Sequence, residues 1–345
     1  MWQGDGPGGW LDYSANIRPE GAPEWVREAL CRGMDNVAYY PDQEMRRARE
    51  SLAKYLQIPV ECSLPTAGGI SAIDMATHLD TTGMILCTPC FAEYGMQSAN
   101  RGKNVYSVSL MAGRHEIGAP AEMLSGKLFD GCTVWLCNPL NPVGVAFARD
   151  RILAVLDEVE KVGGWLVVDE AFIEYCPKHS VITLVNESRR LLVTGSMTKI
   201  LGIPGVRLGY LGAPPQVLAA LKRYQLTWEI SCFAEAVLNA LPEHRTDIAR
   251  DAARNAVRRE QLRQGLEEMG IFVYPSEAAF LLADFERPVD PIIARLKERG
   301  ILVRHCMNFE GIDDGRHLRL AVKDEKSNRK LLDALKEAFI CAESL

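Results

Sequence analysis

The sequence has no strong excess of charge of either sign and no long hydrophobic run. A formal net charge of −6 over 345 residues gives no electrostatic basis for binding nucleic acid or an acidic membrane surface. No apolar stretch approaches the length of a membrane span, and the first residues lack the basic region and apolar core of a signal peptide. We therefore expect a cytoplasmic protein with no nucleic-acid partner and no membrane partner.

Two further patterns are missing. The 10 cysteines are dispersed, and although Cys87 and Cys90 have the spacing of a zinc pair, Cys132 and Cys137 make a poor second pair. We therefore expect no metal and mostly reduced core thiols. No Gly-x-Gly-x-x-Gly follows an early strand, which argues against a nicotinamide cofactor.

What the middle of the chain does contain is a regular alternation of short apolar runs with amphipathic segments. The runs predict strands over Met84–Thr88, Val105–Leu110, Thr133–Cys137, Trp165–Asp169, Leu191–Thr194 and Leu208–Gly212. The amphipathic segments predict helices over Glu44–Leu56, Ser71–Leu79, Ala92–Asn100 and Arg149–Val162. Such an order is typical of an α/β fold with a mostly parallel sheet flanked by helices.

After Pro242 the pattern changes to that of a smaller α+β domain. We predict a long helix over Thr246–Met269, a last helix from Asp324, and strands near Phe272–Tyr274, Phe280–Asp284, Leu302–His305 and His317–Ala321. The first forty residues contain one good helix, Pro23–Gly33. We expect a large domain over residues 40–240 and a small domain made of residues 1–39 and 241–345.

The most informative segment is the one that contains Lys199. This lysine follows a buried strand and lies among small hydroxyl and glycine residues, whereas Lys54, Lys297 and Lys330 lie in charged helical patterns. Partial desolvation favours the neutral, nucleophilic amine that Schiff-base chemistry needs. A structural lysine beside a turn is the alternative.

Three other segments also contain candidate ligand residues, and open α/β sheets bind ligands at the ends of their strands. Gly68-Gly69 before a helix could bind a phosphate through backbone N–H groups, or could be a plain turn. Asp169 ends an apolar strand and needs a cationic partner, which could be a protonated ring nitrogen, an arginine or a metal. Asn141 lies in a loop of two Asn-Pro pairs, whose amides could donate to a ligand.

Several remaining candidates are donors to anions. Ser196 and Arg207 flank the lysine segment and suit a phosphate. Arg304 and Arg319 each interrupt an apolar strand pattern near the C-terminus. Arginine suits a bidentate grip on a carboxylate, although arginines at sheet edges are also common surface residues.

In this order the motifs resemble the fold-type I aminotransferase family of pyridoxal 5′-phosphate (PLP) enzymes, over nearly the whole chain. The motifs are Tyr40-Pro41-Asp42, Gly68-Gly69, Asn141-Pro142, Asp169-Glu170-Ala171, Ser196-x-x-Lys199, Arg207-Leu208-Gly209 and Arg319. The resemblance implies the PLP-dependent transferase fold of type I and PLP as the cofactor. It also implies a homodimer, because Tyr40 would reach the cofactor of a second subunit.

The resemblance assigns a role to each position. Lys199 would form the Schiff base and shuttle protons, and Asp169 would hold the pyridinium N–H. The other implied cofactor contacts are Asn141 to the phenolic oxygen, Tyr94 stacked on the ring, and Gly69, Ile70, Ser196 and Arg207 around the phosphate. Arg319 would hold the substrate's α-carboxylate.

Within the family the chain is most similar to the threonine-phosphate decarboxylases of cobalamin biosynthesis, which are relatives of the histidinol-phosphate aminotransferases. Phe172 carries much of this similarity, because the aminotransferases usually have tyrosine there. By similarity, Asn16 and Arg304 would bind a substrate phosphate. Three features depart from the family. No His-Gly-Gly is recognisable in residues 1–10, the loop from Gly68 to Ser71 replaces the usual Gly-x-Thr-Glu, and Asn-Pro-Val-Gly from Asn141 replaces the usual Asn-Pro-Thr-Gly.

These observations predict a decarboxylase of an O-phospho-amino acid, with phosphothreonine as the first substrate to consider and phosphoserine as another. A transaminase of a phosphorylated amino compound is the alternative. The choice depends on which bond at Cα stands perpendicular to the cofactor ring. A non-catalytic regulatory protein with this fold is a third possibility, against which an intact Lys199, Asp169 and Arg207 argue.

Overall fold

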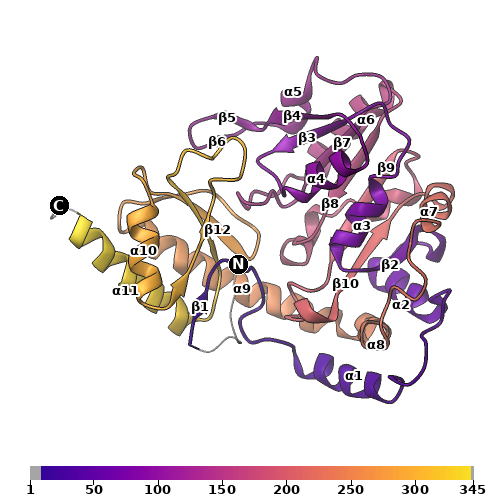
Figure 1. The fold of residues 1–345 in the computed structure, drawn as a ribbon, viewed down its shortest axis with the longest axis horizontal. Coiled ribbons are helices and arrows are strands. Elements are labelled where there is room, and N and C mark those ends of the chain that lie inside the picture. Colours follow the sequence, from indigo (N-terminus) through magenta and orange to yellow (C-terminus); the bar gives the residue numbers. More distant parts are fainter. Residues whose placement is uncertain (1–8, 343–345) are drawn as a thin grey trace.

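Two lobes make up the chain in a computed structural model that describes residues 9–342 (Figure 1). The larger lobe is built on a seven-stranded sheet in the order β2-β10-β9-β8-β7-β3-β4. Its strands are β2 (Ser63–Ala67), β3 (Met84–Thr88), β4 (Val105–Ser109), β7 (Thr133–Cys137), β8 (Trp165–Asp169), β9 (Leu191–Ser196) and β10 (Leu208–Gly212). Only β10 runs antiparallel to its neighbours, so the sheet is mostly parallel.

The strands at the centre of this sheet are apolar because helices cover both faces. Every residue of β3, β7 and β9 is buried, as expected for parallel strands packed on both sides. The helices of this lobe are α2 (Arg46–Leu56), α3 (Gly69–Ala76), α4 (Glu93–Asn100), α5 (Pro120–Leu124), α6 (Arg149–Lys161), α7 (Pro215–Lys222) and α8 (Cys232–Ala240). The predicted α/β class is confirmed.

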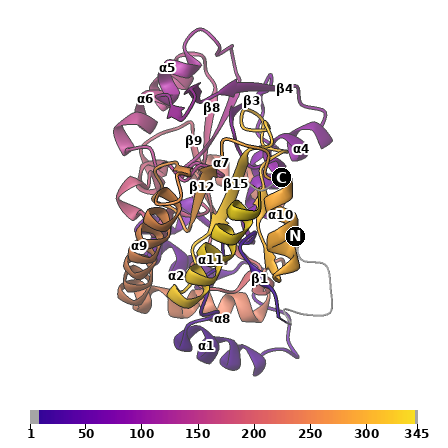
Figure 2. The same ribbon diagram turned by 90° about the vertical axis from the view of Figure 1, so that its left-hand side faces the viewer.

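The smaller lobe has a four-stranded sheet in the order β11-β12-β15-β14. These strands are β11 (Phe272–Val273), β12 (Phe280–Asp284), β14 (Arg304–His305) and β15 (His317–Ala321). Helices α9 (Arg245–Glu267), α10 (Asp290–Glu298) and α11 (Glu325–Ala342) cover one face of the sheet (Figure 2). Leu318 and Leu320 face these helices in one apolar core, so the alternation along β15 turns Arg319 to the opposite face, toward the large lobe.

The N-terminal segment contacts both lobes. Strand β1 (Leu11–Asp12) pairs in parallel with β13 (Ile301–Leu302), whereas α1 (Glu24–Met34) packs against α8. The division of the chain at residues 40 and 240 therefore stays a prediction. Residues 1–8, most of the stretch in which the family's His-Gly-Gly is not recognisable, lie outside the described residues.

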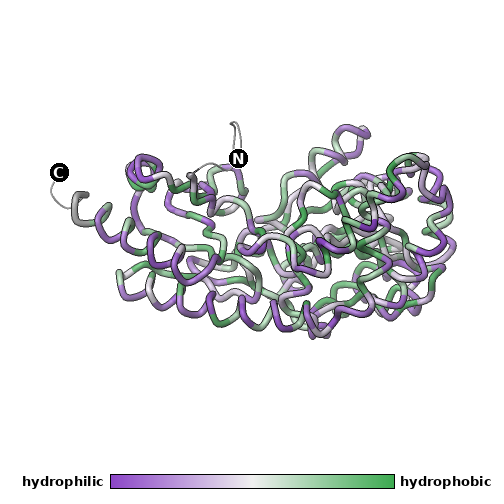
Figure 3. Tube along the Cα trace, turned by 90° about the horizontal axis from the view of Figure 1, so that it is seen from below, coloured by the Kyte–Doolittle hydropathy of each residue, from purple (hydrophilic) through white to green (hydrophobic). Residues whose placement is uncertain are grey.

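The outer helices have one hydrophobic and one hydrophilic face. In Figure 3 the two kinds of residue alternate along the peripheral helices. The β-hairpin of β5 (Met111–Gly113) and β6 (Glu116–Ile117) extends from the large lobe and touches the small one, where His115 bonds to Asp284 at 2.8 Å. Within residues 9–342, no helix combines the length and apolar character that crossing a bilayer requires.

Candidate active site

The candidate residues meet where the C-terminal ends of β7, β8 and β9 face the small lobe. Asp169 is the last residue of β8 and Ser196 the last of β9, while Asn141 follows β7. From the opposite side, Arg319 Nη1 donates to Asn141 Oδ1 at 2.7 Å. This hydrogen bond joins two predicted ligand residues that are far apart in the sequence, one on each lobe.

Asp169 is a buried carboxylate surrounded by donors. Its Oδ1 accepts from Thr194 Oγ1 and from the Ala171 N–H, each at 3.1 Å, and its Oδ2 accepts from the Tyr94 hydroxyl. Burial raises the pKa of Asp169, while these hydrogen bonds and the charge of Lys199 oppose that rise. The carboxylate is thus prepared to receive one further cationic donor.

Lys199 lies in the turn after β9, within the electrostatic reach of Asp169. Burial lowers the pKa of its amine, the nearby guanidinium of Arg207 lowers it further, and Asp169 acts in the opposite direction. The Arg18 N–H donates to the Lys199 carbonyl at 3.1 Å, which fixes the backbone of the turn. A lowered pKa favours the neutral form of an amine, which is the form that attacks a carbonyl group.

Gly68, Gly69 and Gly209 form a cradle of backbone without side chains beside the lysine turn, at the start of α3. A Cβ on Gly209 would lie 2.4 Å from the carbonyl carbon of Gly68, and one on Gly69 would lie 3.4 Å from Ser196 Cβ. A Cβ on Gly68 would lie 2.7 Å from the guanidinium of Arg207, whose own backbone is left-handed with φ of 59°. Strained, close-packed backbone of this kind is typical of ligand sites, and the N-terminus of α3 suits a phosphate.

Arg319 and Arg304 lie directly opposite each other in the β14–β15 pair. Burial lowers the pKa of Arg319 to about 10, and its Nη2 also donates to the Ser14 carbonyl at 2.7 Å. Arg304 donates to Asn308 at 2.8 Å. Asn16 lies two residues after Ser14, and its side chain is buried. Its Oδ1 has no hydrogen-bond partner within residues 9–342.

The structure shows the surroundings of the two aromatic candidates, Tyr94 and Tyr40, which the sequence alone did not reveal. Tyr94 has no exposed surface, and its ring stacks on Trp135 at 4.9 Å, which favours a role in holding Asp169 over one in stacking on a cofactor. Its neighbour Phe91 is 37% exposed and meets Tyr94 edge-on. Tyr40 is 79% exposed and packs on Trp228, so its ring is accessible to a second subunit.

Some residues at the site carried little signal in the sequence. Ser14 contributes a backbone carbonyl, which no side-chain pattern reveals. Asn138, whose motif looked like that of Asn141, closes its own loop through two hydrogen bonds with Phe147. Glu229 accepts from the backbone of Ala67 at 2.7 Å, although it lies in a loop with no recognisable motif.

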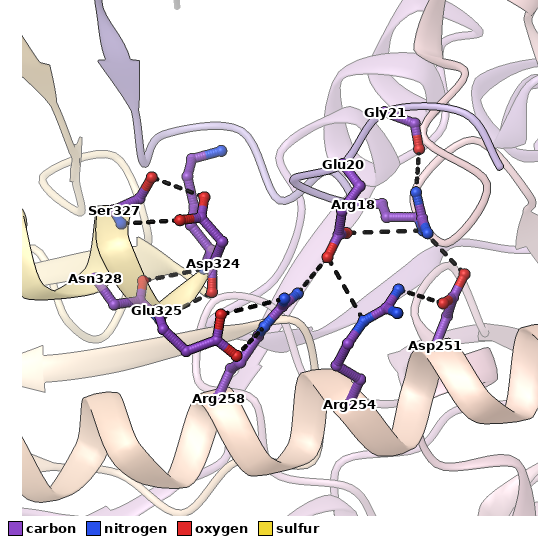
Figure 4. A network of polar contacts seen from close by, with 11 residues as sticks. Arg18, Glu20, Gly21, Asp251, Arg254, Arg258, Asp324, Glu325, Ser327 and Asn328 are labelled. Atoms are coloured by element: carbon purple, nitrogen blue, oxygen red, sulfur yellow. Dashed lines mark hydrogen bonds and ion pairs between the residues drawn. The ribbon is translucent and has the colours of Figure 1, made fainter.

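An ion-pair network anchors the N-terminal segment that carries Asn16 (Figure 4). Arg18 Nε donates to Asp251 on α9 at 2.9 Å, and both side chains are nearly buried. Glu20 pairs with Arg258, which in turn pairs with Glu325 of α11 at 2.9 Å. The segment between Tyr13 and Gly21 is thereby fixed between the lysine turn and the small lobe.

The model of the family "Aminotransferase class I and II" matches residues 10–335. The chain belongs to this family. A threonine-phosphate decarboxylase of Salmonella typhimurium is 33% identical over 340 residues, which cover 95% of this chain and 91% of that protein.

Solved structures agree with the fold. The histidinol-phosphate aminotransferase of Clostridium acetobutylicum has a TM-score of 0.86 at 29% identity, covering 95% of this chain and 98% of that one. The histidinol-phosphate aminotransferase of Sinorhizobium meliloti, solved in complex with PLP, has a TM-score of 0.86 at 18% identity, covering 96% and 91%. The predicted fold type I is confirmed, and the cofactor of this chain is PLP.

The residues of the site fit this cofactor. The glycine cradle with Arg207 provides N–H groups and a cation for the phosphate, and Asp169 offers a buried carboxylate for the ring nitrogen. Lys199 supplies an amine with a lowered pKa. Ile70 is the second residue of α3, so its N–H belongs to the first turn of that helix.

Proposed function

We propose that this chain decarboxylates an O-phospho-amino acid, with L-threonine O-3-phosphate as the substrate and (R)-1-aminopropan-2-ol O-phosphate as the product, for the nucleotide loop of cobalamin. One observation carries the proposal. Arg304 is the cross-strand partner of Arg319, and its charge acts on the Arg319 guanidinium; two arginines on neighbouring strands match a substrate that has both a carboxylate and a phosphate. The 33% identity to a threonine-phosphate decarboxylase supports the same choice.

Each residue has a separate task in this proposal. When bound, the cofactor withdraws electrons from the bond that breaks at Cα. Arg319 orients the carboxylate, while Arg304 and Asn16 hold the phosphate. Lys199 binds the cofactor aldehyde and later delivers a proton to Cα, and Asp169 stabilises positive charge at the ring nitrogen. The partly exposed ring of Phe91 meets Tyr94 edge-on, and Tyr94 in turn donates to Asp169.

Phe172 supports decarboxylation through the resemblance described above, in which the histidinol-phosphate aminotransferases usually have tyrosine at this position. Phe172 is 5% exposed and packs edge-on against Phe280 at 5.0 Å. The guanidinium of Arg319 lies 5.4 Å from the centre of the same Phe280 ring. This apolar wall restricts the position of Arg319, and thereby the direction in which a substrate carboxylate can point.

We infer that the active unit is a homodimer. Tyr39 and Tyr40 are 73% and 79% exposed, and Trp228 beside them is 47% exposed. Aromatic side chains of this size gathered on one surface are typical of protein interfaces. Light scattering during size-exclusion chromatography tests the inference: the expected mass is twice the 38.3 kDa of one chain, and a monomer at assay concentration would refute it.

A second candidate is transamination, which the likeness to the C. acetobutylicum histidinol-phosphate aminotransferase favours. The two reactions are separated by incubating the pure protein and PLP with phosphothreonine, phosphoserine or histidinol phosphate. The proposal predicts release of carbon dioxide from phosphothreonine without any need for an oxo acid. Amino transfer to 2-oxoglutarate without carbon dioxide would refute it and establish the second candidate.

A further inference from the structure

Glu229 lies against the first turn of α3, at the cradle described above. Its Oε1 accepts the Ala67 N–H at 2.7 Å and also the hydroxyl of Ser71. Glu229 comes from the loop of residues 223–231, between α7 and α8, and is 158 positions from Ser71 in the sequence. One carboxylate oxygen therefore joins the residue before the glycine pair to the third residue of the helix.

In this contact the carboxylate at the start of the helix comes from a loop far away in the sequence and not from the helix itself. In a capping box, a glutamate at the third helical position reaches back to a backbone N–H at the start of the helix. Here the third position is Ser71, and the N-cap is Gly68, which has no side chain to accept a hydrogen bond. Glu229 brings a carboxylate to this turn from outside the helix and binds the N–H of Ala67, one residue before the N-cap, where its negative charge is favourable.

The contact adds to hydrogen bonds that Gly68 makes with Thr66, whose carbonyl accepts the Gly68 N–H at 2.8 Å and whose Oγ1 donates to the Gly68 carbonyl at 3.0 Å. Glycine loses the most conformational entropy on ordering, and Gly68 and Gly69 are adjacent. The same loop also binds the end of β2, since Gln225 Nε2 donates to the Pro65 carbonyl at 2.8 Å. With both ends of the glycine pair held, the N–H groups of Gly69 and Ile70 have fixed directions before any anion arrives.

We propose that Glu229 is a positioning residue that pre-forms the phosphate cradle of the cofactor. The inference rests on the phosphate lying at the start of α3, as proposed above, and not on the choice between decarboxylation and transamination. Glu229 acts through Ala67 and Ser71.

The test is a titration of the apoprotein with PLP and with pyridoxal, which lacks the phosphate. Glu229→Ala should weaken PLP binding about tenfold, the equivalent of one lost charged hydrogen-bonding group, and change pyridoxal binding less than about twofold. Glu229→Gln keeps an acceptor oxygen and should stay within about threefold of the parent. The control Glu61→Ala, an exposed carboxylate just before β2, should change neither affinity.

An exchange of the two side chains gives the sharpest readout. Ser71→Glu/Glu229→Ser moves the carboxylate to the local capping position and should recover PLP affinity to within about threefold. Hydrogen exchange in the apoprotein should be faster over residues 67–72 in Glu229→Ala and return to the parent rate in the exchange variant. Should Glu229→Ala not fold, recovery of folding and PLP affinity by the exchange variant supports the proposal, and no recovery contradicts it.

A second variant, Arg207→Met, tests separately whether the cofactor phosphate lies at the start of α3. Arg207→Met should reduce the preference for PLP over pyridoxal; if it does not, the placement of the phosphate is wrong. If Arg207→Met reduces the preference but Glu229→Ala leaves PLP affinity unchanged, improves it, or weakens both ligands equally, Glu229 has no positioning role.

Discussion

The central residue-scale feature is the balance of charges around Asp169. Burial favours the neutral acid, whereas the hydrogen bonds from Tyr94 and Thr194 and the charge of Lys199 favour the carboxylate. A cationic ring nitrogen in contact with Asp169 would settle this balance in favour of the ion pair. The carboxylate would then keep the cofactor ring charged, which is the condition for withdrawing electrons from Cα.

Asp169→Asn removes this charge while keeping the shape of the side chain. We expect kcat/KM to fall about 100- to 1,000-fold, which corresponds to the loss of one buried charge pair. The cofactor should still bind, since the phosphate cradle and Lys199 are unchanged. Asp80→Asn, at an exposed position, is the control. A kcat/KM within a few-fold of the parent would show that Asp169 does not face the ring nitrogen.

How far the sequence could predict the site depended on the type of residue. Lys199 follows an apolar strand, Asp169 ends one and Arg319 interrupts one, so the residue type marks each of them, and the structure brings them to one region. The carbonyl of Ser14 and the carboxylate of Glu229 carry no such mark, because their roles depend on which loops meet in three dimensions. Their contacts became visible only with the fold.

At the scale of elements, the segment after β8 contains a buried acid whose titration should affect stability. Glu170 is fully buried, accepts from Ser180 Oγ at 2.7 Å and from the Val181 N–H at 2.6 Å, and burial raises its pKa to about 8. Unfolding returns the pKa to near 4.5. Between these values the folded state binds more protons than the unfolded state, so stability must fall as pH rises.

Glu170→Gln should abolish this dependence. Relative to the variant, the free energy of unfolding of the parent apoprotein should fall by up to about 1.4 kcal/mol per pH unit between about pH 5 and about pH 8. Urea denaturation at several pH values measures the difference. Two curves that stay parallel over this range would mean that Glu170 is ionised in the folded protein.

The elements themselves were predictable where the apolar pattern is continuous. The predicted strands Met84–Thr88, Thr133–Cys137 and Trp165–Asp169 coincide with β3, β7 and β8. Strand β2 was missed because Pro65 interrupts it, which is tolerated only because β2 is at the edge of the sheet. The single strand expected over Leu302–His305 is two, since β13 pairs with β1 and β14 with β15.

At the scale of the whole molecule, ion pairs connect segments that are distant in the sequence. The Arg18–Asp251 pair joins the N-terminal segment to α9, and its side chains are only 12% and 13% exposed. Because the Arg18 N–H also holds the carbonyl of Lys199, this pair helps to unite the small lobe, the N-terminal segment and the lysine turn.

Arg18→Met should lower the free energy of unfolding by about 2 kcal/mol, because it leaves Asp251 nearly buried with fewer partners. The matched control is Arg250→Ala, which removes an exposed ion pair with Asp247 on the same helix and should cost less than about 0.5 kcal/mol. Chemical denaturation of both variants measures the two values. Equal effects would mean that the Arg18 pair is an ordinary surface contact.

The proposed function requires that Lys199 is the amine that binds the cofactor aldehyde. The most direct measurement is reduction of the holoprotein with borohydride, followed by peptide mapping of the pyridoxyl label. We predict a single label on the peptide that contains Lys199, and its loss in Lys199→Ala. A label on another lysine such as Lys54 or Lys297, or no label in a protein that binds PLP, would contradict the account.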